Sequence, residues 1–378
     1  MTVSTPTRGS RTITFLLGKR DMPADGVQDY CEYLGRALQA RSVRSQIARL
    51  NWNTDGWWKA LRELRRQCSE ESPDWVILQF TALGWSKRGF PLGAIAALAI
   101  ARRCANRCAV VFHDPYGAKG KRLVDKIRGS FQSWVIRRLY QMADKAIFAD
   151  PLEKIEWLRQ TEEKAVFIPI GANIPDGAEA PLAHLSRDSR FSTVSIYCLS
   201  DPPNLYRELD DIVHAARMAA SSGSSLGVTF LGRGTGEARS AIDRAFRGTN
   251  VSVSNLGIRE PDEVRQVLAD SQAMLCVRGP LYPRRGSALA GVACGLPIVA
   301  YAGAAEGTPI EEAGVELVPY RDREALGRAL QRILLDESLW ERQHDRSILA
   351  HRRYFSWDLV ASKFEAFLNS GDAVRSPN

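Results

Sequence analysis

The sequence has no apolar run approaching the roughly 20 residues that a membrane-spanning helix needs. Its longest apolar stretch, residues 90–101, has the length of a helix in a protein core. Residues 1–11 are polar and lack the apolar core of a secretory signal peptide. These absences predict a cytoplasmic protein and argue against a secreted or membrane-spanning one.

Disulfide frameworks and metal-binding clusters are absent too. The seven cysteines are an odd number, dispersed along the chain and mostly in apolar surroundings. Cys104 and Cys108 lie one helical turn apart, but no second pair of Cys or His residues accompanies them. We therefore predict free thiols, no bound metal and no resident cofactor.

Several signatures of catalysis are also missing. No glycine-rich loop carries the Lys-Ser/Thr pair of a phosphate-loop kinase, and no Gly-x-Ser-x-Gly elbow of a hydrolase occurs. The glycines of segment 232–236 (GRGTG) follow a predicted strand and precede a predicted helix, as in a phosphate or nucleotide loop. Their spacing differs from a dinucleotide fingerprint, and no acidic residue ends a strand about 20 residues later, which argues against nicotinamide binding.

Lysine and arginine outnumber the acidic residues, 51 to 43, for a formal net charge of +8. Such an excess suits an anionic substrate, an anionic membrane surface or nucleic acid, or serves solubility alone. Because the basic residues are dispersed over many helices and no RNA-recognition or helix-turn-helix module is present, we predict no nucleic-acid partner. The predicted basic helix 119–142 contains Phe131, Trp134 and Tyr140. It is interpreted either as peripheral contact with anionic lipid head groups or as a surface helix whose aromatic residues pack inward.

Short apolar segments alternate with amphipathic helices along the whole chain, which predicts an α/β fold with mostly parallel sheets. A segment rich in Pro, Ala, Asp and Ser, residues 172–190, separates two such series and is predicted to be a linker. The predicted strands of the first series are 13–17, 43–50, 75–80, 108–112, 146–149 and 166–171. Those of the second are 192–198, 226–231, 251–255, 273–277, 298–301 and 315–319.

The segment 284–299 (RRGSALAGVACGLPIV) is predicted to form a loop, a helix, a tight turn and a buried strand. Gly286 and Ser287 suit the helix start, where a serine hydroxyl can accept a hydrogen bond from an N–H of the first turn. Gly295 suits the left-handed end of the helix, and a proline follows it. Two arginines before a helix N-terminus form an arrangement that binds anions, although an ordinary helix–strand unit explains the same residues.

In parallel sheets, ligands bind where strands end. His113 and Asp114 directly follow the predicted strand 108–112. His113 is therefore a candidate general base, or a group that polarises a leaving group, with a structural histidine as the alternative.

Two Rossmann-like halves with a helical tail resemble the GT-B fold of glycosyltransferases. The order of motifs is similar to the large retaining family called family four (glycosyl transferases group 1), over about residues 13–367. The segments that carry the resemblance are 25–30 (DGVQDY), 112–114 (FHD), 166–175 (VFIPIGANIP), 286–297 (GSALAGVACGLP) and 354–357 (YFSW). The resemblance implies an acceptor domain over 1–175, a donor domain over 190–354, a deep interdomain cleft, and a helix over 355–370 that crosses back to the first domain.

It further implies a metal-independent hexosyltransferase that moves a sugar from a nucleotide-sugar donor, UDP- or GDP-linked, with retention of configuration. The acceptor would be a hydroxyl of a glycan, a polysaccharide precursor or a lipid-linked molecule. His113 and Asp114 would lie at the reacting centre, and Asp25 and Gly26 in the loop near the acceptor and phosphate. The donor would contact Arg207, Gly232, Gly234, Ile258, Arg284, Arg285, Gly286, Ser287 and Ala288.

The chain also departs from this family. Two glutamates that touch the sugar and ribose in many members fall on Tyr282 and Ala290 here, and segment 200–202 lacks the usual arginine. A branch of the family with an Arg-Arg-Gly-Ser entry to the donor helix resembles this chain instead. Three alternatives therefore stay open: a nucleotide-sugar epimerase of the same fold, a catalytically silent nucleotide-sugar-binding subunit, and a basic nucleic-acid- or lipid-binding protein.

Overall fold

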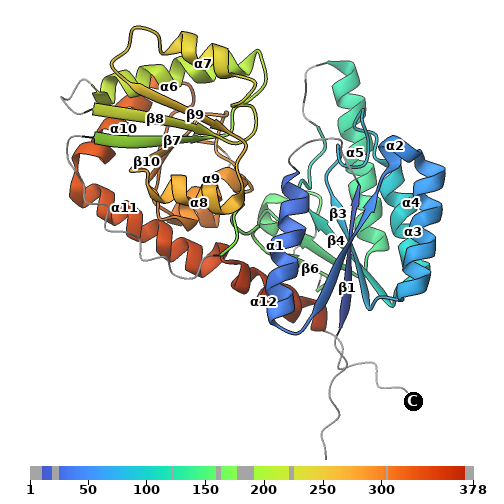
Figure 1. The fold of residues 1–378 in the computed structure, drawn as a ribbon. Coiled ribbons are helices and arrows are strands. Elements are labelled where there is room, and N and C mark those ends of the chain that lie inside the picture. The colour runs from blue at the N-terminus through green and yellow to red at the C-terminus, as the bar shows by residue number, and fades with distance from the viewer. Residues whose placement is uncertain are drawn as a thin grey trace, which may run out of the picture. The chain divides into compact units, whose positions relative to one another are not determined.

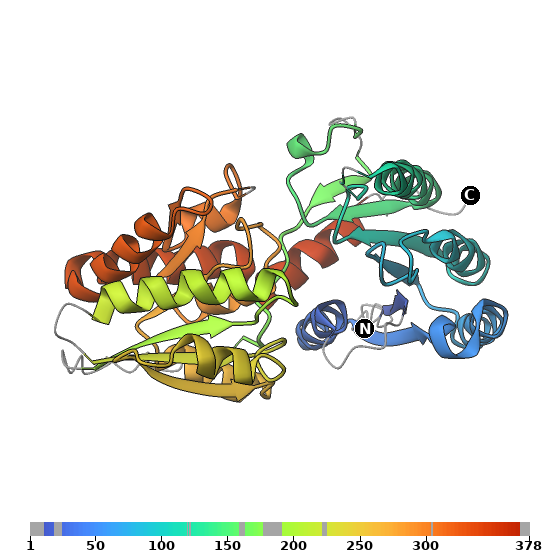
Figure 2. The same cartoon turned by 90° about the horizontal axis from the view of Figure 1, so that it is seen from above.

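The computed structural model describes residues 11–18, 25–118, 120, 122–158, 163–176, 191–220, 225–303 and 305–370. The chain divides into two units, Met1–Pro169 with Val360–Asn378, and Ile170–Leu359. Each unit is a parallel sheet covered by helices on both faces (Figures 1 and 2). The predicted linker lies largely on residues 177–190, which are outside the described residues.

The sheet of the first unit has six parallel strands in the order β2-β1-β3-β4-β5-β6. β3 and β4 are central and almost wholly buried, because their apolar runs are covered by helices on both faces. The order reverses direction between β1 and β3, the point at which such sheets bind ligands beyond the strand ends. The strands are β1 (Thr12–Gly18), β2 (Arg44–Leu50), β3 (Trp75–Phe80), β4 (Arg107–Phe112), β5 (Lys145–Phe148) and β6 (Ala165–Phe167).

One face of this sheet is covered by α3, α4 and α5, and α1 lies on the other (Figure 2). α4 is lined by small residues that pack closely against β3 and β4. The longer helices are α1 (Gly26–Ala40), α3 (Trp57–Glu71), α4 (Leu92–Cys104) and α5 (Leu123–Met142), with short turns α2 (Trp52–Asp55) and η1 (Leu152–Lys154).

The sheet of the second unit also has six parallel strands, in the order β12-β11-β10-β7-β8-β9, which reverses between β7 and β10. The strands are β7 (Phe191–Tyr197), β8 (Ser225–Leu231), β9 (Ser252–Gly257), β10 (Ala273–Cys276), β11 (Ile298–Tyr301) and β12 (Val315–Val318). The core on one face is built with α6 (Asn204–Ala220), α7 (Arg239–Ala245) and α10 (Arg323–Leu335). The core on the other face is built with α8 (Pro261–Ala269), α9 (Gly286–Ala293) and the end of α11 (Glu337–Ala350). Ile310 of η2 (Pro309–Glu312) belongs to the same core.

The C-terminal helix α12 (Trp357–Asn369) begins in the second unit and ends in the first. At its start, the indole of Trp357 donates to the carbonyls of Ala172 and Ile174, at 3.0 Å each. Towards its end, Phe364 packs edge-on against Phe15 of β1, and Arg41 donates to Glu365 at 2.9 Å. The predicted α/β class and the C-terminal helix that returns to the first unit are therefore confirmed.

The boundaries of some elements differ from the prediction, because particular residues end the hydrogen bonding of a strand or interrupt a helix. The predicted strand 166–171 ends at Phe167, because Pro169 has no N–H to donate to a neighbouring strand. The helical tail is interrupted by a π-helical turn (His351–Phe355) and by Ser356, whose backbone is extended. The predicted helix 119–142 begins at Leu123, and residues 119 and 121 lie outside the described residues.

Candidate active site

The entrance to α9 carries two backbone N–H groups without acceptors. The N-cap residue is Arg285, whose carbonyl accepts from the N–H groups of Ala288 and Leu289 at 2.9 and 3.1 Å. Within the described part of the chain, the N–H groups of Gly286 and Ser287 have no hydrogen-bond acceptor. Both residues are partly exposed, so the positive end of the helix dipole is accessible.

The prediction that the Ser287 hydroxyl caps α9 is wrong. The helix begins one residue earlier, at Gly286, so Ser287 is the second helical residue and its side chain makes no capping bond. Ala288 is fully buried and its N–H is already bonded, so it offers a ligand neither a side chain nor a free donor. Gly286 and Ser287 are left as the two residues of α9 that an anion can reach.

A pair of arginines lies beside this helix entrance. Arg285 donates from Nη2 to the carbonyl of Pro280 at 3.2 Å, while its Nη1 is buried without an acceptor among the described residues. The Nε of Arg278, just beyond β10, is likewise buried and unbonded. Burial lowers the pKa of Arg285; the nearby charge of Arg278 adds to this effect, and Glu208 and other neighbours oppose it.

Glu208 is a carboxylate whose charge partly offsets that of Arg285. It is completely buried, at 0% exposure, and accepts from the N–H of Ser200 at 2.9 Å. Its charge acts on Arg285, and its Oε1 is buried without a hydrogen-bond donor among the described residues. Buried donors on Arg285 and Arg278 likewise lack an acceptor there. Since a buried donor without a partner costs about 1–3 kcal/mol, the two arginines are chemically complementary to an anion.

The glycine loop after β8 packs against the end of β7. Gly234 has a φ of +84°, and a Cβ there would lie 2.5 Å from the carbonyl oxygen of Leu199. Gly232 also has a positive φ, and its N–H donates to Gly257 at 2.7 Å. These glycines therefore allow close backbone approach, and the N–H of Gly232 is not free for a phosphate. Ile258, next after Gly257, is 51% exposed at the end of β9.

Arg207 on α6 is a further basic residue predicted to bind the donor. It lies near Asp211 and Tyr301, where burial raises the pKa of Asp211 while Tyr301 and Arg207 oppose the rise. The neighbours of Arg285 are instead Arg278, Glu208, Cys276 and Tyr282. Arg285, Gly286 and Ser287 are consecutive at the entrance of α9, and the charge of Arg207 acts on Asp211 and Tyr301. Arg284, also predicted to bind the donor, is partly buried next to Arg285.

Of the two positions at which many members of the resembled family carry glutamates, Tyr282 is half-exposed and its ring lies 6.0 Å from the guanidinium carbon of Arg285. Ala290 is completely buried in the helix core. A ligand can therefore contact an aromatic ring at the first position, whereas the side chain at the second position is buried and out of its reach.

In the first unit, His113 lies directly after β4, as predicted. Its Nε2 is 2.8 Å from Oε1 of Gln79 on β3, which makes Nε2 the proton-bearing nitrogen when that oxygen accepts. The ring of Tyr30 meets the imidazole edge-to-face, with centroids 4.9 Å apart. Asp114 is exposed. β3, β4 and α1 thus hold the imidazole at the carboxyl edge of the sheet.

The N-terminus of α1 is acidic. Asp25 is its N-cap and accepts from the N–H of Val27 at 3.0 Å, next to the exposed Gly26. Burial, with Glu32 and Asp25 nearby, raises the pKa of Asp29 to about 6. These carboxylates oppose an anion at Asp25 and Gly26 and suit a hydroxyl-bearing partner, because carboxylates accept hydrogen bonds.

Sequence reasoning missed Gln79, Glu208 and Arg278. Gln79 is the one polar residue of the strand WVILQF, and Arg278 is the first charged residue after β10. Both occupy strand-end positions where parallel sheets bind ligands, which is the signal that marks them. Glu208 stands on the buried face of α6, and a charged residue at an apolar position of a helix is the corresponding signal.

Two features are absent from the residues that the structure describes. No three His, Cys, Asp or Glu side chains among them gather as a potential metal site. None of their helices combines the length and apolarity needed to cross a membrane.

Comparisons with known proteins find likeness in structure alone. The sequence matches no family model, and no curated protein matches it. Among solved structures, HepE of Anabaena, determined with UDP and glucose, matches with a TM-score of 0.64 at 13% identity, covering 95% of this chain and 100% of that one. Sucrose-phosphate synthase of Thermosynechococcus elongatus matches with 0.66 at 15%, covering 97% and 100%. A putative UDP-N-acetylglucosamine 2-epimerase of Listeria monocytogenes matches with 0.59 at 12%, covering 98% of each chain.

These likenesses show the fold: two Rossmann-like units in the GT-B arrangement of elements. The identities are too low to carry substrate or activity from one chain to another.

Proposed function

We propose that the protein is a glycosyltransferase that uses a nucleoside-diphosphate sugar, UDP- or GDP-linked, as its donor. The supporting observation is the pair of unbonded N–H groups at Gly286 and Ser287 beside Arg278 and Arg285, at the carboxyl edge of the second sheet. A diphosphate would accept from these four groups and balance the excess positive charge. The fold shared with HepE, a protein solved with UDP, agrees with this donor class.

In this proposal, the reaction is accelerated by stabilisation of the negative charge that forms on the leaving group. When the glycosidic bond to the diphosphate breaks, negative charge builds on the leaving phosphate. Amides and guanidinium groups that are already oriented stabilise that charge more than they stabilise the intact donor, which lowers the barrier. These groups would do so without a metal ion. Ile258 and the ring of Tyr282 are exposed apolar surfaces for the base or sugar.

On the acceptor side, we propose that His113 contacts the sugar or the attacking hydroxyl. Gln79 and Tyr30 fix the imidazole, so its position costs little entropy on binding. Asp25 and Asp29 near the start of α1 would accept from acceptor hydroxyls of a glycan, a polysaccharide precursor or a lipid-linked sugar. Attack from the face that the diphosphate leaves would retain the anomeric configuration.

The donor site is tested by calorimetric titration with UDP, GDP and UMP. A diphosphate is expected to bind more tightly than the monophosphate, because it reaches both arginines and both amides. Ser287→Pro removes the N–H and is expected to weaken UDP binding about tenfold, the effect of one charge-assisted hydrogen bond. Ser287→Ala keeps the N–H and serves as the matched control. Equal affinity of Ser287→Pro and wild type for UDP would refute this placement of the diphosphate.

A second candidate function is epimerisation of a nucleotide sugar, favoured by the likeness to the putative epimerase of Listeria. NMR of the donor alone separates the two activities. An epimerase converts the sugar with no acceptor present, whereas a transferase leaves it unchanged until an acceptor hydroxyl is supplied. Binding without either reaction would identify a silent nucleotide-sugar-binding subunit.

A further inference from the structure

The outward face of α5 carries an apolar stripe that stays exposed among the residues that the structure describes. Leu123, Ile127 and Trp134 are 73%, 54% and 52% exposed and lie four and seven residues apart, which places them on one side of the helix. The opposite side is buried against the core of the first unit through Gly129, Gln132, Val135, Ile136, Leu139 and Tyr140. α5 is therefore anchored on one face and presents apolar side chains on the other.

Exposed basic side chains flank this stripe, and no acidic side chain of the described residues pairs with them. Lys126, Arg137 and Arg138 are exposed and form no ion pair or hydrogen bond through their side chains with any described residue. The helix has a single acidic residue, Asp125, which is engaged by Arg128 at 3.0 Å. The outward face thus combines apolar side chains with unpaired cations.

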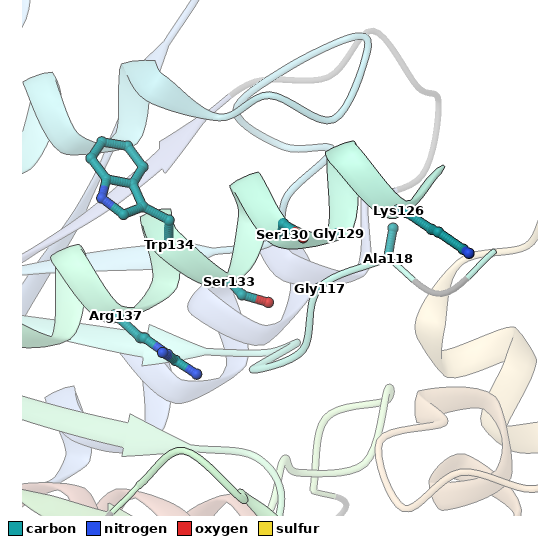
Figure 3. Close-up of a pocket in the computed structure, with 8 residues that line it drawn as sticks. All are labelled: Gly117, Ala118, Lys126, Gly129, Ser130, Ser133, Trp134 and Arg137. Carbon is teal, nitrogen blue, oxygen red and sulfur yellow. The ribbon is translucent and has the colours of Figure 1, made fainter. Parts of the chain in front are cut away.

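A cavity of about 570 Å³ opens along one side of the stripe (Figure 3). Lys126 and Arg137 extend from the helix towards it, and the hydroxyl of Ser133 lies between them (Figure 3). The ring of Trp134 extends from the other side of the helix in the same view. The cavity is lined by Gly117, Ala118, Lys126, Gly129, Ser130, Ser133, Trp134 and Arg137.

The wall of this cavity is held in place by close packing. A Cβ at Gly117 would lie 2.2 Å from the carbonyl oxygen of Gly129, so only glycine lets this segment approach α5. The buried side chain of Gln132 accepts from the N–H of Ala118 at 2.7 Å and donates to the carbonyl of Gly89 at 2.8 Å. The cavity is thus a built feature of the helix and its neighbouring loop.

We propose that this face of α5 docks on an anionic lipid bilayer. Leu123, Ile127 and Trp134 would enter the region between head groups and acyl chains, while Lys126 and Arg137 would hold a lipid phosphate at the cavity mouth. Cations beside apolar side chains match a surface with negative charge above a hydrocarbon layer. Two copies of the chain docked through this same face are disfavoured, because their cations would meet like charges.

This inference does not rest on the proposed function, since it concerns a helix remote in sequence from the α9 entrance and a ligand other than the donor. It is tested by co-sedimentation of the full chain with vesicles of phosphatidylcholine alone and with added phosphatidylglycerol. Binding is expected only to the anionic vesicles and should weaken with salt. Binding to neither vesicle type, or equally to both, would overturn the proposal.

Charge-reversal variants distinguish vesicle binding through this face of α5 from binding driven by the net charge of the protein. Each basic side chain near an anionic surface contributes about fivefold to the partition coefficient, so Lys126→Glu with Arg137→Glu should reduce binding at least about 25-fold. Arg62→Glu with Arg65→Glu on α3 changes the net charge equally at exposed positions and should retain most of the binding. Equal losses from both pairs would show that net charge alone drives association and would overturn the docking face.

The apolar stripe is tested separately. Leu123→Ser with Ile127→Ser should lower binding to anionic vesicles about tenfold or more, because two exposed aliphatic side chains no longer enter the bilayer. The control is Leu349→Ser on α11, a similarly exposed leucine in the second unit. Unchanged binding of the double variant would remove the apolar contact from the proposal. UDP affinity, measured in parallel, is expected to stay at the wild-type value in all these variants.

Discussion

Replacing Arg285 with methionine tests two separate effects of this side chain. One is its effect on the stability of the ligand-free protein, and the other is its effect on the affinity for UDP. Methionine keeps much of the side-chain length and removes the charge. In the ligand-free protein, Arg285 is desolvated, its pKa is lowered, and its buried Nη1 has no acceptor among the described residues. Because burial disfavours the charge of Arg285 more than Glu208 and its other neighbours favour it, we expect the ligand-free variant to be as stable as the wild type or slightly more stable.

Binding should change in the opposite direction. A charge-assisted hydrogen bond contributes about 1.5–3 kcal/mol, or roughly 10- to 150-fold in Kd. At UDP near 100 times the wild-type Kd, bound ligand raises the free energy of unfolding by about 2.7 kcal/mol. After a loss of about 100-fold in affinity, the same concentration contributes only about 0.4 kcal/mol. For a unit of this length, the UDP-induced rise in Tm should fall from roughly 5–10 °C to about 1–2 °C.

The assay is differential scanning calorimetry with and without UDP, alongside direct titration. Arg328→Met on α10 is the control, because that side chain is 62% exposed and its pairing with Glu324, at 4.0 Å, is weak. A variant at Arg285 that keeps the full UDP-induced rise in Tm would refute the reasoning. So would a large loss of ligand-free stability, since it would make Arg285 a structural residue.

Three further predictions concern single positions. His113→Ala should lower turnover by about 10²–10⁴-fold and leave the Kd for UDP within about twofold; a wild-type rate would remove the imidazole from the chemistry. Asp29→Asn should raise stability to urea by about 1–2 kcal/mol above about pH 6, because the pKa raised from 3.8 to about 6 makes the ionised carboxyl costly in the folded state. The gain should vanish below about pH 4, and a gain that is independent of pH would contradict this cause. Gly234→Ala should cost about 1–3 kcal/mol, since φ is +84° and the Cβ would lie 2.5 Å from Leu199, whereas the control Gly236→Ala has no atom within 4 Å of its Cβ and should cost little.

Much of the architecture follows from local sequence patterns. Continuous apolar runs such as residues 75–80 mark strands that are buried on both faces, and these strands appear within a residue or two of their predicted bounds. The end of α9 was also predictable: Gly295 takes a φ of +70°, and Pro297 follows before β11. These features depend on neighbours a few residues away, so the chain specifies them without reference to the rest of the fold.

The face that α5 presents could not be read from its sequence. From the sequence, its three aromatic residues could either contact lipid head groups or pack inward. In the structure, two of them pack against other aromatic residues and one is exposed. Phe131 packs against Phe90 with centroids 5.3 Å apart, and Tyr140 is buried against Trp157 at 5.4 Å, whereas Trp134 stays exposed. Which face of a helix is covered depends on the elements that pack beside it, and those are distant in sequence.

By itself, the sequence determined the two αβ series, the strand-end position of His113 and the glycine entry to α9, because periodicity and turn chemistry are local properties. Only the tertiary structure decided that Arg278 after β10 and Glu208 on α6 meet Arg285, and that Gln79 on β3 meets His113. Charges and hydrogen bonds act over a few ångströms in space, and parallel strands bring together residues that lie far apart along the chain.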